Sequence, residues 1–461
     1  MQKHWHNRFH LEMPAGVLQN PDGVVFFEGE YHIFCPWSPD GDAQLPERWF
    51  HIHTRDFVRC SRPEEVFWPE GMTGSTAAFA GCLYVEDGRL CVLYLDGVLI
   101  EHGQQCLQLH TGSLERNRVV PQEAGFQILV PEGYRVQSCS PSLFRRNEKN
   151  YLALGAQTSE QRGCVLLYAA DGEGGWSFQD ELHTQLGSFG TLWASPRLVR
   201  FGMRDALLLA PQGLLAEPYA YENAHVSGYL AGQFSTAAQE LLHGRFQELD
   251  HGFDFYAPQQ VCHEGRNILF GWLGMPDQES DYPSSASGWC AAFTMPRMLM
   301  LRRGHIYSQP VPELEALRIE ATARELLYEN TAYVSACLPE GAEIILDIAP
   351  GQATQLCFNL VYGLEKIQMH YDREEQLMWI DRSGMKLGAG GTRTFRLPAG
   401  DAFSVHLFVD KSIVEVFLQH GEEAATFFVF PEKHILPELV IDADGEMERV
   451  AGQIWSLEAI K

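Results

Sequence analysis

Hydrophobic and polar residues follow one recurring pattern along the first 300 or so residues. Each unit opens with a small or polar residue, usually followed by proline, and continues into two apolar runs separated by a short polar turn. Such turns favour tight β-hairpins, so each unit predicts a strand, a turn and a second strand. The turns are Glu28-Gly29-Glu30, Asp87-Gly88, Arg146-Asn147-Glu148, Phe201-Gly202 and Glu264-Gly265.

The spacing of these units predicts the architecture. From Pro21, the steps to Ser75, Pro141, Pro196 and Pro258 are 54, 66, 55 and 62 residues. Further short strands follow each hairpin, and repeats of four antiparallel strands about 40–60 residues long are typical of a β-propeller. Five units predict five blades over residues 1–310, with the x-Pro elements beginning the strands that line the central funnel. Their polar residues are therefore expected to converge on one pocket.

The pattern changes after residue 310. Residues 311–327, VPELEALRIEATARELL, combine helical spacing with helix-forming residues and predict a linker helix. Beyond it, alternating runs such as SVHLFVDKSIVEVFLQHGEEAATFFVF are typical of a β-sandwich, which we expect over residues 328–461. The predicted fold class is all-β: a five-bladed β-propeller followed by a C-terminal β-sandwich.

The net charge of the chain limits the classes of molecule that it is expected to bind. The 461 residues include 34 Lys+Arg and 60 Asp+Glu, a formal net charge of −26. Such a chain repels nucleic acid and anionic membrane surfaces but not a neutral sugar. The start of the sequence lacks an apolar signal segment and the 11 cysteines include no CxxC pair, so we expect a cytoplasmic protein with free thiols. No cofactor and no metal is expected, because His4, His6 and His10 lack a carboxylate or cysteine to complete a ligand set.

Several segments resemble glycoside hydrolase family 32, the β-fructofuranosidases and sucrose-6-phosphate hydrolases. They include RFHLEMPAGVLQNPDGVVFFEGEYHIFCPWSP, LDHGFDFYAPQ, ILFGWLGMPD, YPSSASGWCAAFTMPRMLML, PVPELEALR and VDKSIVEVFLQHGEEAATFFVFP. The resemblance implies a five-bladed propeller with an appended β-sandwich. It also implies retaining hydrolysis at a fructofuranose, with one Asp as nucleophile, one Glu as acid and a second Asp that stabilises the transition state.

The same resemblance places the three family carboxylates on positions that hold none. The nucleophile motif W-M-N-D-P-N-G corresponds to VLQNPDG, which puts Asn20 at the nucleophile position. The stabiliser motif R-D-P corresponds to CSP with Ser140, and the acid motif W-E-C-P corresponds to WASP with Ala194. A Gln that the family uses near the sugar falls at Pro36. An amide is a poor nucleophile, alanine has no proton to donate, and a hydroxyl cannot balance an oxocarbenium charge as a carboxylate does.

We therefore expect a protein that binds a fructofuranoside or a related sugar and has lost, or strongly impaired, the retaining hydrolysis of the family. The alternative is an active glycosidase, β-fructofuranosidase-like or acting on another furanoside, with a rearranged catalytic constellation for which Asp22 and Asp254 are the candidates. Against Asp22, two residues along a strand displace a side chain by about 6–7 Å. A hydrogen bond to the turn before Gly23 explains Asp22 more simply. A third hypothesis is a subunit or regulator that uses the propeller as an interaction surface.

The resemblance also implies that a sugar pocket remains. Aromatic faces stack on sugar rings and polar groups orient them. For Trp49 and Trp289, packing in the core explains the residue equally well. The expected partner is a small sugar, and self-association through the sandwich is left open. The expected binding residues are Gln19, Trp49, Gly74, Ser75, Cys139, Ser195, Tyr256, Gln259 and Trp289.

Overall fold

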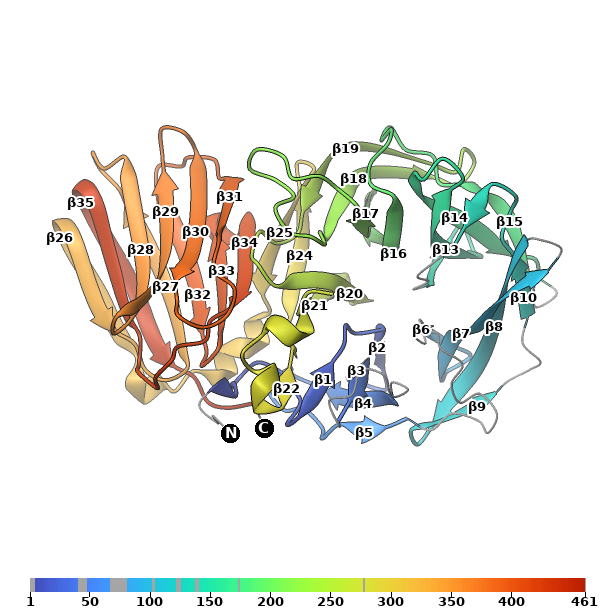
Figure 1. Ribbon diagram of the computed structural model, residues 1–461, viewed down its shortest axis with the longest axis horizontal. Helices are drawn as coiled ribbons and strands as arrows, with labels where there is room; N and C mark the ends of the chain where they lie inside the picture. Colours follow the sequence, from blue (N-terminus) through green and yellow to red (C-terminus); the bar gives the residue numbers. More distant parts are fainter. Residues whose placement is uncertain are drawn as a thin grey trace.

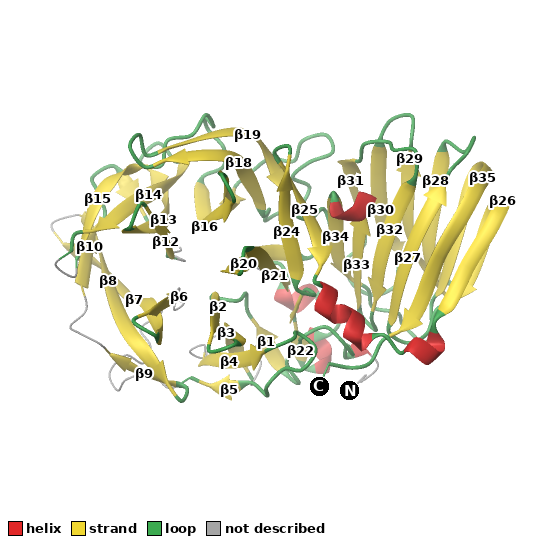
Figure 2. Cartoon of the chain, turned by 180° about the vertical axis from the view of Figure 1, so that it is seen from behind, coloured by secondary structure: helices red, strands yellow, loops and turns green. Residues whose placement is uncertain are grey.

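The computed structural model describes residues 5–39, 48–66, 81–101, 104–121, 126–136, 141–172, 175–276 and 278–460. Five antiparallel sheets form a ring, and a domain of ten strands lies beside it (Figure 1). The predicted all-β fold, a five-bladed propeller followed by a C-terminal β-domain, is confirmed. The helices in the described ranges are short 3₁₀ helices, and none of them has the length and apolar character to cross a membrane. Figure 2 shows that most of them lie where the propeller meets the second domain.

Each blade runs from the propeller axis outward. Blade 1 consists of β1 (Gly16–Leu18), β2 (Gly23–Phe27), β3 (Glu30–Ser38), β4 (Arg48–Thr54) and β5 (Glu64–Glu65). Blade 2 consists of β6 (Gly81–Glu86), β7 (Arg89–Glu101), β8 (Gln104–Glu115), β9 (Arg118–Pro121) and β10 (Phe126–Leu129). Blade 3 consists of β11 (Tyr134–Arg135), β12 (Ser142–Arg146), β13 (Lys149–Thr158), β14 (Gly163–Ala170) and β15 (Trp176–Glu181). Blade 4 consists of β16 (Leu192–Phe201), β17 (Arg204–Gln212), β18 (Gly228–Ser235) and β19 (Glu240–Glu248). Blade 5 consists of β20 (Phe255–His263), β21 (Arg266–Leu273), β23 (Ala292–Phe293), β24 (Arg297–Arg302) and β25 (His305–Pro310).

The inner strands close the ring. β2 contacts β6, β6 contacts β12, β12 contacts β16, and β20 contacts both β17 and β2. After blade 5, the chain passes through η2 (Glu279–Asp281) and η3 (Ser285–Ser287) to β22 (Trp289–Cys290), which pairs in parallel with β1 of blade 1. The indole Nε1 of Trp272 in blade 5 also donates to the carbonyl of Leu18 at 3.0 Å. The first and last blades are therefore joined by backbone and side-chain hydrogen bonds.

In blades 4 and 5 the x-Pro elements lie inside the inner strands, which corrects the prediction that they begin them, whereas in blade 3 Pro141 directly precedes β12 as predicted. Ser195-Pro196 forms a bulge in β16 between Ala194 and Arg197, and Ala257-Pro258 forms the equivalent bulge in β20. In blade 1, Asn20-Pro21 separates β1 from β2, although both strands pair with β3. Proline has no N–H to donate to a ladder, so a strand accommodates it at a break or a bulge.

The linker helix expected over residues 311–327 is not found. Two 3₁₀ helices, η4 (Pro312–Leu317) and η5 (Glu320–Thr322), are followed by strand β26 (Arg324–Cys337). The N–H of Ile319 donates to the carbonyl of Ser456 at 2.9 Å, and β26 pairs with β35 from Arg324 onward. Pairing with β35 takes the backbone hydrogen bonds that a helix would have formed, so tertiary context overrides helix propensity. The first strand of the second domain, β26, therefore starts at Arg324, within the segment expected to be the linker.

The second domain consists of one continuous sheet that folds back on itself. Strand β35 pairs with β28 through its first part and with β27 through its last, so it belongs to both halves. Leu356 of β28 and Leu407 of β32 belong to the same apolar core between the halves. The strands are β26, β27 (Ala342–Ala349), β28 (Gln355–Tyr362), β29 (Glu365–Asp372), β30 (Leu377–Gly384), β31 (Thr392–Arg396), β32 (Phe403–Val409), β33 (Ile413–Leu418), β34 (Glu423–Phe428) and β35 (Glu438–Ser456), with η6 (Gln419–Gly421) after β33.

Candidate functional site

Two of the positions expected to correspond to family carboxylates are described, one between two strands of blade 1 and one on the inner strand of blade 4. Asn20 is half-buried in the segment between β1 and β2. Ala194 lies in β16, is 4% exposed, and belongs to the apolar cluster that also contains Leu18 and Tyr256. Ser140 lies outside the described residues, as do Cys139, Gly74 and Ser75. Neither described position offers an ionisable group.

The two expected binding tryptophans are packed in the core. Trp49 and Trp289 are each 1% exposed. Trp49 lies between blades 1 and 2, so close to Gly81 that a Cβ on that glycine would lie 2.7 Å from the indole ring. Trp289 stacks on His6 with ring centroids 5.0 Å apart. This burial favours the packing interpretation of both residues.

The remaining expected binding residues surround the bulges of the inner strands. The N–H of Gln19 donates to the carbonyl of Pro36 at 3.0 Å, which keeps this part of blade 1 attached to β3. Ser195 is half-buried and has a positive φ of 49° within the bulge of β16. Tyr256 and Gln259 flank the matching bulge of β20, and both are buried.

Four polar residues directly follow the prolines of the repeats in blades 1, 3, 4 and 5. Asp22, Ser142 and Gln259 are buried, and Arg197 is half-buried. Neither amide atom of Gln259 has a hydrogen-bond partner in the described parts of the chain. Of the four, Asp22 is the one carboxylate, and its N–H donates to the carbonyl of Phe34 at 2.9 Å. These four described positions thus offer amide, hydroxyl and guanidinium groups and one carboxylate.

Arg197 was not anticipated from the sequence. Its Nε and Nη2 are buried and have no hydrogen-bond partner among the described residues. Burial lowers the pKa of the guanidinium, and nearby Cys82 and Asp22 partly offset that effect. Cys82 belongs to blade 2 and Asp22 to blade 1, so the guanidinium of Arg197 in blade 4 lies within electrostatic range of groups on two other blades. Its place directly after the proline of the fourth unit was the signal that could have identified it.

Tyr256 is linked to the loop that follows β17. Its pKa is raised by burial, and a hydrogen bond with Gln212 partly opposes the rise. His225, which pairs with Gln212 across the base of the loop, lies edge-on to Tyr256 at 5.4 Å between ring centroids. The phenol is therefore held in place from one side by this loop.

Asp254, the second candidate carboxylate, lies at the junction of the two domains. It is 1% exposed, and its Oδ1 accepts a hydrogen bond from the Tyr282 hydroxyl at 2.9 Å. Its Oδ2 accepts from Arg382 Nη1 at 2.7 Å and from the N–H of Phe428 at 2.8 Å. Both oxygens are engaged in tying blade 5 to the second domain, which favours a hydrogen-bonding role over catalysis. Among the described residues, no group of three or more His, Cys, Asp or Glu side chains is arranged to hold a metal ion.

Two family models match the chain: the glycosyl hydrolases family 32 N-terminal domain over residues 10–310 and the glycosyl hydrolases family 32 C-terminal domain over residues 313–455. The chain is 32% identical to sucrose-6-phosphate hydrolase of Bacillus subtilis (strain 168), over 97% of this chain and 93% of that protein. It is 29% identical to sucrose-6-phosphate hydrolase of Staphylococcus xylosus, over 94% of this chain and 89% of that protein.

Solved structures share the fold. Sucrose-6-phosphate hydrolase from Lactobacillus gasseri aligns with a TM-score of 0.86 at 24% identity, covering 100% of this chain and 94% of that one. The Bombyx mori GH32 β-fructofuranosidase aligns with a TM-score of 0.82 at 23% identity, covering 100% and 95%, and a mutant of it has been solved in complex with sucrose. With both halves of the chain matched by family models, the protein belongs to glycosyl hydrolase family 32.

Proposed function

We propose that this protein binds a fructofuranoside or a related sugar at the centre of the propeller and does not perform the retaining hydrolysis of its family. The observation that carries the proposal is the absence of a carboxylate at Asn20 and Ala194, the two described positions that correspond to the family nucleophile and acid. Retaining hydrolysis needs two carboxyl groups about 5–5.5 Å apart, one ionised and one protonated.

The surroundings of Ala194 support the proposal that the protein lacks the general acid of its family. Its methyl group lies within an apolar cluster, and the next residue, Ser195, is held in the bulge of β16. Asp22 remains as a carboxylate, but it lies two residues beyond the nucleophile position and close to the positive charge of Arg197.

Sugar binding needs fewer groups than hydrolysis. Polar side chains that orient hydroxyl groups, together with apolar faces, are sufficient to hold a sugar. Gln259, Arg197 and Tyr256 supply hydrogen-bonding groups from blades 4 and 5. The relatives named above are sucrose-6-phosphate hydrolases, so sucrose and sucrose 6-phosphate are the first ligands to test.

The test measures fructose release and binding on the same preparation. Sucrose, sucrose 6-phosphate and short fructo-oligosaccharides are incubated with concentrated protein over long times, beside an Asn20→Ala control, and binding is followed by calorimetry. We expect no release above the control and measurable binding of at least one of these sugars. Release that occurs in the wild type and disappears in Asp22→Asn would instead support the rearranged glycosidase. A protein that neither releases fructose nor binds any of these sugars would contradict the proposal. That result would favour a role as an interaction subunit.

A further inference from the structure

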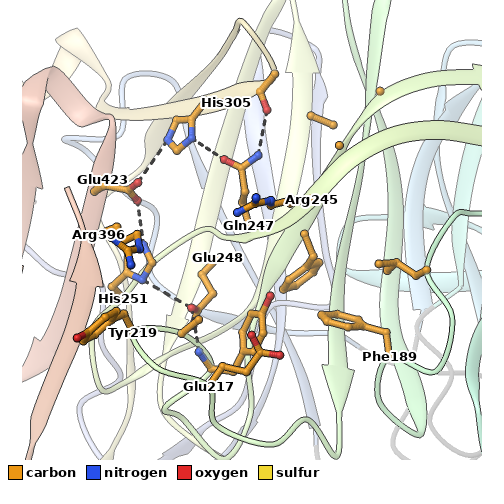
Figure 3. Close-up of a pocket in the computed structure, with 18 of the residues that line it drawn as sticks. Phe189, Glu217, Tyr219, Arg245, Gln247, Glu248, His251, His305, Arg396 and Glu423 are labelled. Atoms are coloured by element: carbon orange, nitrogen blue, oxygen red, sulfur yellow. Dashed lines mark hydrogen bonds and ion pairs between the residues drawn. The ribbon is translucent and has the colours of Figure 1, made fainter. Parts of the chain in front are cut away.

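A hollow of about 1100 Å³ lies at the perimeter of the propeller, beside the second domain (Figure 3). Its walls come from strands β18 and β19 of blade 4, the loop between β17 and β18, the turn between β24 and β25, and strands β31 and β34 of the second domain. No lining residue belongs to β2, β6, β12, β16 or β20, so the hollow is separate from the propeller centre. Ligand sites commonly enclose about 300–1,000 Å³, which makes this space large enough for a mono- or disaccharide.

Arginine side chains surround the hollow. Arg204, Arg245, Arg303 and Arg396 all line it, and all four are exposed. Within the described part of the chain, the first three make no side-chain hydrogen bond or ion pair, and Arg396 lies over the ring of Tyr219 at 5.4 Å. The chain as a whole carries a formal charge of −26, so four arginines around one hollow form a local positive region on an acidic protein.

Two of the three carboxylates in the lining lie beside histidines, and the charge of His251 offsets part of theirs. Glu423 Oε2 lies 2.9 Å from His251 Nε2, and Glu423 Oε1 lies 3.7 Å from His305 Nε2. Glu248 lies 3.7 Å from the other nitrogen of His251, as Figure 3 shows. Burial acts to lower the pKa of His251, but Glu423 and Glu248 raise it to about 9, so this ring is positively charged at neutral pH. Glu217 is the exposed carboxylate of the lining, and it is outnumbered by the arginines.

An aromatic wall accompanies the charges. The rings of Phe189 and Phe246 lie 4.9 Å apart, and Tyr221 lies 5.8 Å from Phe189. Tyr219 is 38% exposed. Tyr219 and Tyr221 have positive φ angles of 68° and 57°, a costly conformation for bulky residues that persists only where the surroundings impose it. The loop between β17 and β18 is thus held in a strained conformation that places its aromatic residues at the hollow.

We propose that this hollow binds a sugar that carries an anionic group, a phosphate ester or a carboxylate, at a second site of the protein. Guanidinium groups bind such oxygens through two parallel hydrogen bonds, and aromatic faces cover the apolar face of a sugar ring. Neither group alone specifies a sugar, but a positive rim around an aromatic wall matches a molecule with one charged end and one ring. This site does not depend on the binding proposed for the propeller centre.

The test uses ligands that are not fructofuranosides, so that the propeller centre is not probed. Glucose 6-phosphate, glucuronate, glucose and inorganic phosphate are titrated into the full chain by calorimetry at low ionic strength. The variant Arg204→Gln/Arg245→Gln/Arg303→Gln is compared with Arg62→Gln/Arg89→Gln/Arg145→Gln, which removes three exposed arginines that do not line the hollow. Thermal unfolding of both variants verifies that the fold is intact.

We expect glucose 6-phosphate, glucuronate or both to bind the wild type at least tenfold more tightly than glucose. That affinity should fall at least tenfold in the hollow variant and stay within twofold in the control. The stronger of the two anionic ligands identifies the anionic group that the site prefers. Equal binding of glucose, equal losses in the two variants, or inorganic phosphate binding as tightly as glucose 6-phosphate would each overturn the proposal.

Discussion

Arg297 of blade 5 and Glu415 of the second domain form an ion pair in which neither side chain is exposed. Arg297 Nε donates to Glu415 Oε2 at 3.1 Å, and its Nη1 donates to Asp250 at 2.8 Å. His10, from the N-terminal segment, contacts the other oxygen of Glu415 at 3.1 Å and Asp410 at 3.0 Å. Three segments that are far apart in the sequence therefore meet in one buried network of charges.

Removing the arginine from this network should be strongly destabilising. Arg297→Met keeps an unbranched side chain but leaves Asp250 and Glu415 buried without the guanidinium that joins them, and only Glu415 still has His10. We expect a loss of about 3–5 kcal/mol in the free energy of unfolding, measured by denaturant titration. Arg145→Met, at an exposed position, should change it by less than about 0.5 kcal/mol. A loss below about 1 kcal/mol in Arg297→Met would show that the network contributes little.

The same network should make the free energy of unfolding fall as the pH rises into the alkaline range. Burial acts to lower the pKa of His10, but Asp410 and Glu415 raise it to about 9. Because the folded-state pKa lies above the ordinary value of 6.5, the contribution of His10 is complete below pH 6.5 and is lost as the pH rises through about 9. We expect the free energy of unfolding to fall by about 2–3 kcal/mol between pH 6.5 and 9.5 from His10 alone.

Denaturant unfolding at the two pH values, in the wild type and in His10→Gln, checks this. His251 has a pKa of about 9 as well, so part of the pH dependence should remain in the variant. If His10→Gln loses as much stability between pH 6.5 and 9.5 as the wild type does, the charge of His10 is not coupled to folding.

Close approach of the two domains at Gly252 gives a further prediction. A Cβ on this residue would lie 1.9 Å from the carbonyl oxygen and 2.2 Å from the nitrogen of Thr426 in β34. Because both atoms belong to a paired strand, Gly252→Ala should force the domains apart and cost about 1–3 kcal/mol, seen as a lower melting temperature. The matched control is Gly187→Ala, where the added Cβ meets nothing within 4 Å. Equal melting temperatures for the two variants would contradict the close packing.

The cysteines should differ strongly in how fast their thiols react with a reagent in solution. Cys262 and Cys337 are exposed, whereas the other described cysteines are buried or half-buried. Burial raises the pKa of Cys82 and Cys164 to about 12 and of Cys60 and Cys357 to about 11, so these thiols are rarely ionised at neutral pH. In a Cys139→Ser background, the native protein should show two fast-reacting thiols with Ellman's reagent. A third fast thiol would show that one of the inner cysteines is accessible.

Much of the fold was predictable because its signals are local. At the turns Asp87-Gly88 and Glu264-Gly265, all four residues have positive φ, the conformation that such pairs favour in hairpins. The bulges at the x-Pro elements were not predicted, because a proline marks a break in pairing without showing which residues continue the strand on either side. The linker helix was predicted wrongly because β35, the strand that pairs with residues from Arg324 onward, lies more than 100 residues away in the sequence.

The candidate site was predictable only in part. A resemblance indicates where functional positions fall, as at Asn20 and Ala194, but it does not show which other side chains gather around them. Arg197 reaches toward blades 1 and 2, a relationship that exists only once the ring closes. The hollow at the perimeter combines Phe189, Arg303 and Arg396 from three distant segments, and no local pattern in the sequence connects them.

The N-terminal segment bears on the order in which this protein is completed during synthesis. Trp5 donates to the carbonyl of Pro431 at 3.0 Å, the N–H of Phe9 donates to Asp410 at 3.0 Å, and Gly16 donates to Gly288 at 2.7 Å. During synthesis, these residues must therefore wait for partners that are made more than 250 residues later. Domains that form during translation ordinarily fold from the N-terminus, but here Trp5 and Phe9 reach their partners only after Asp410 and Pro431 have been made.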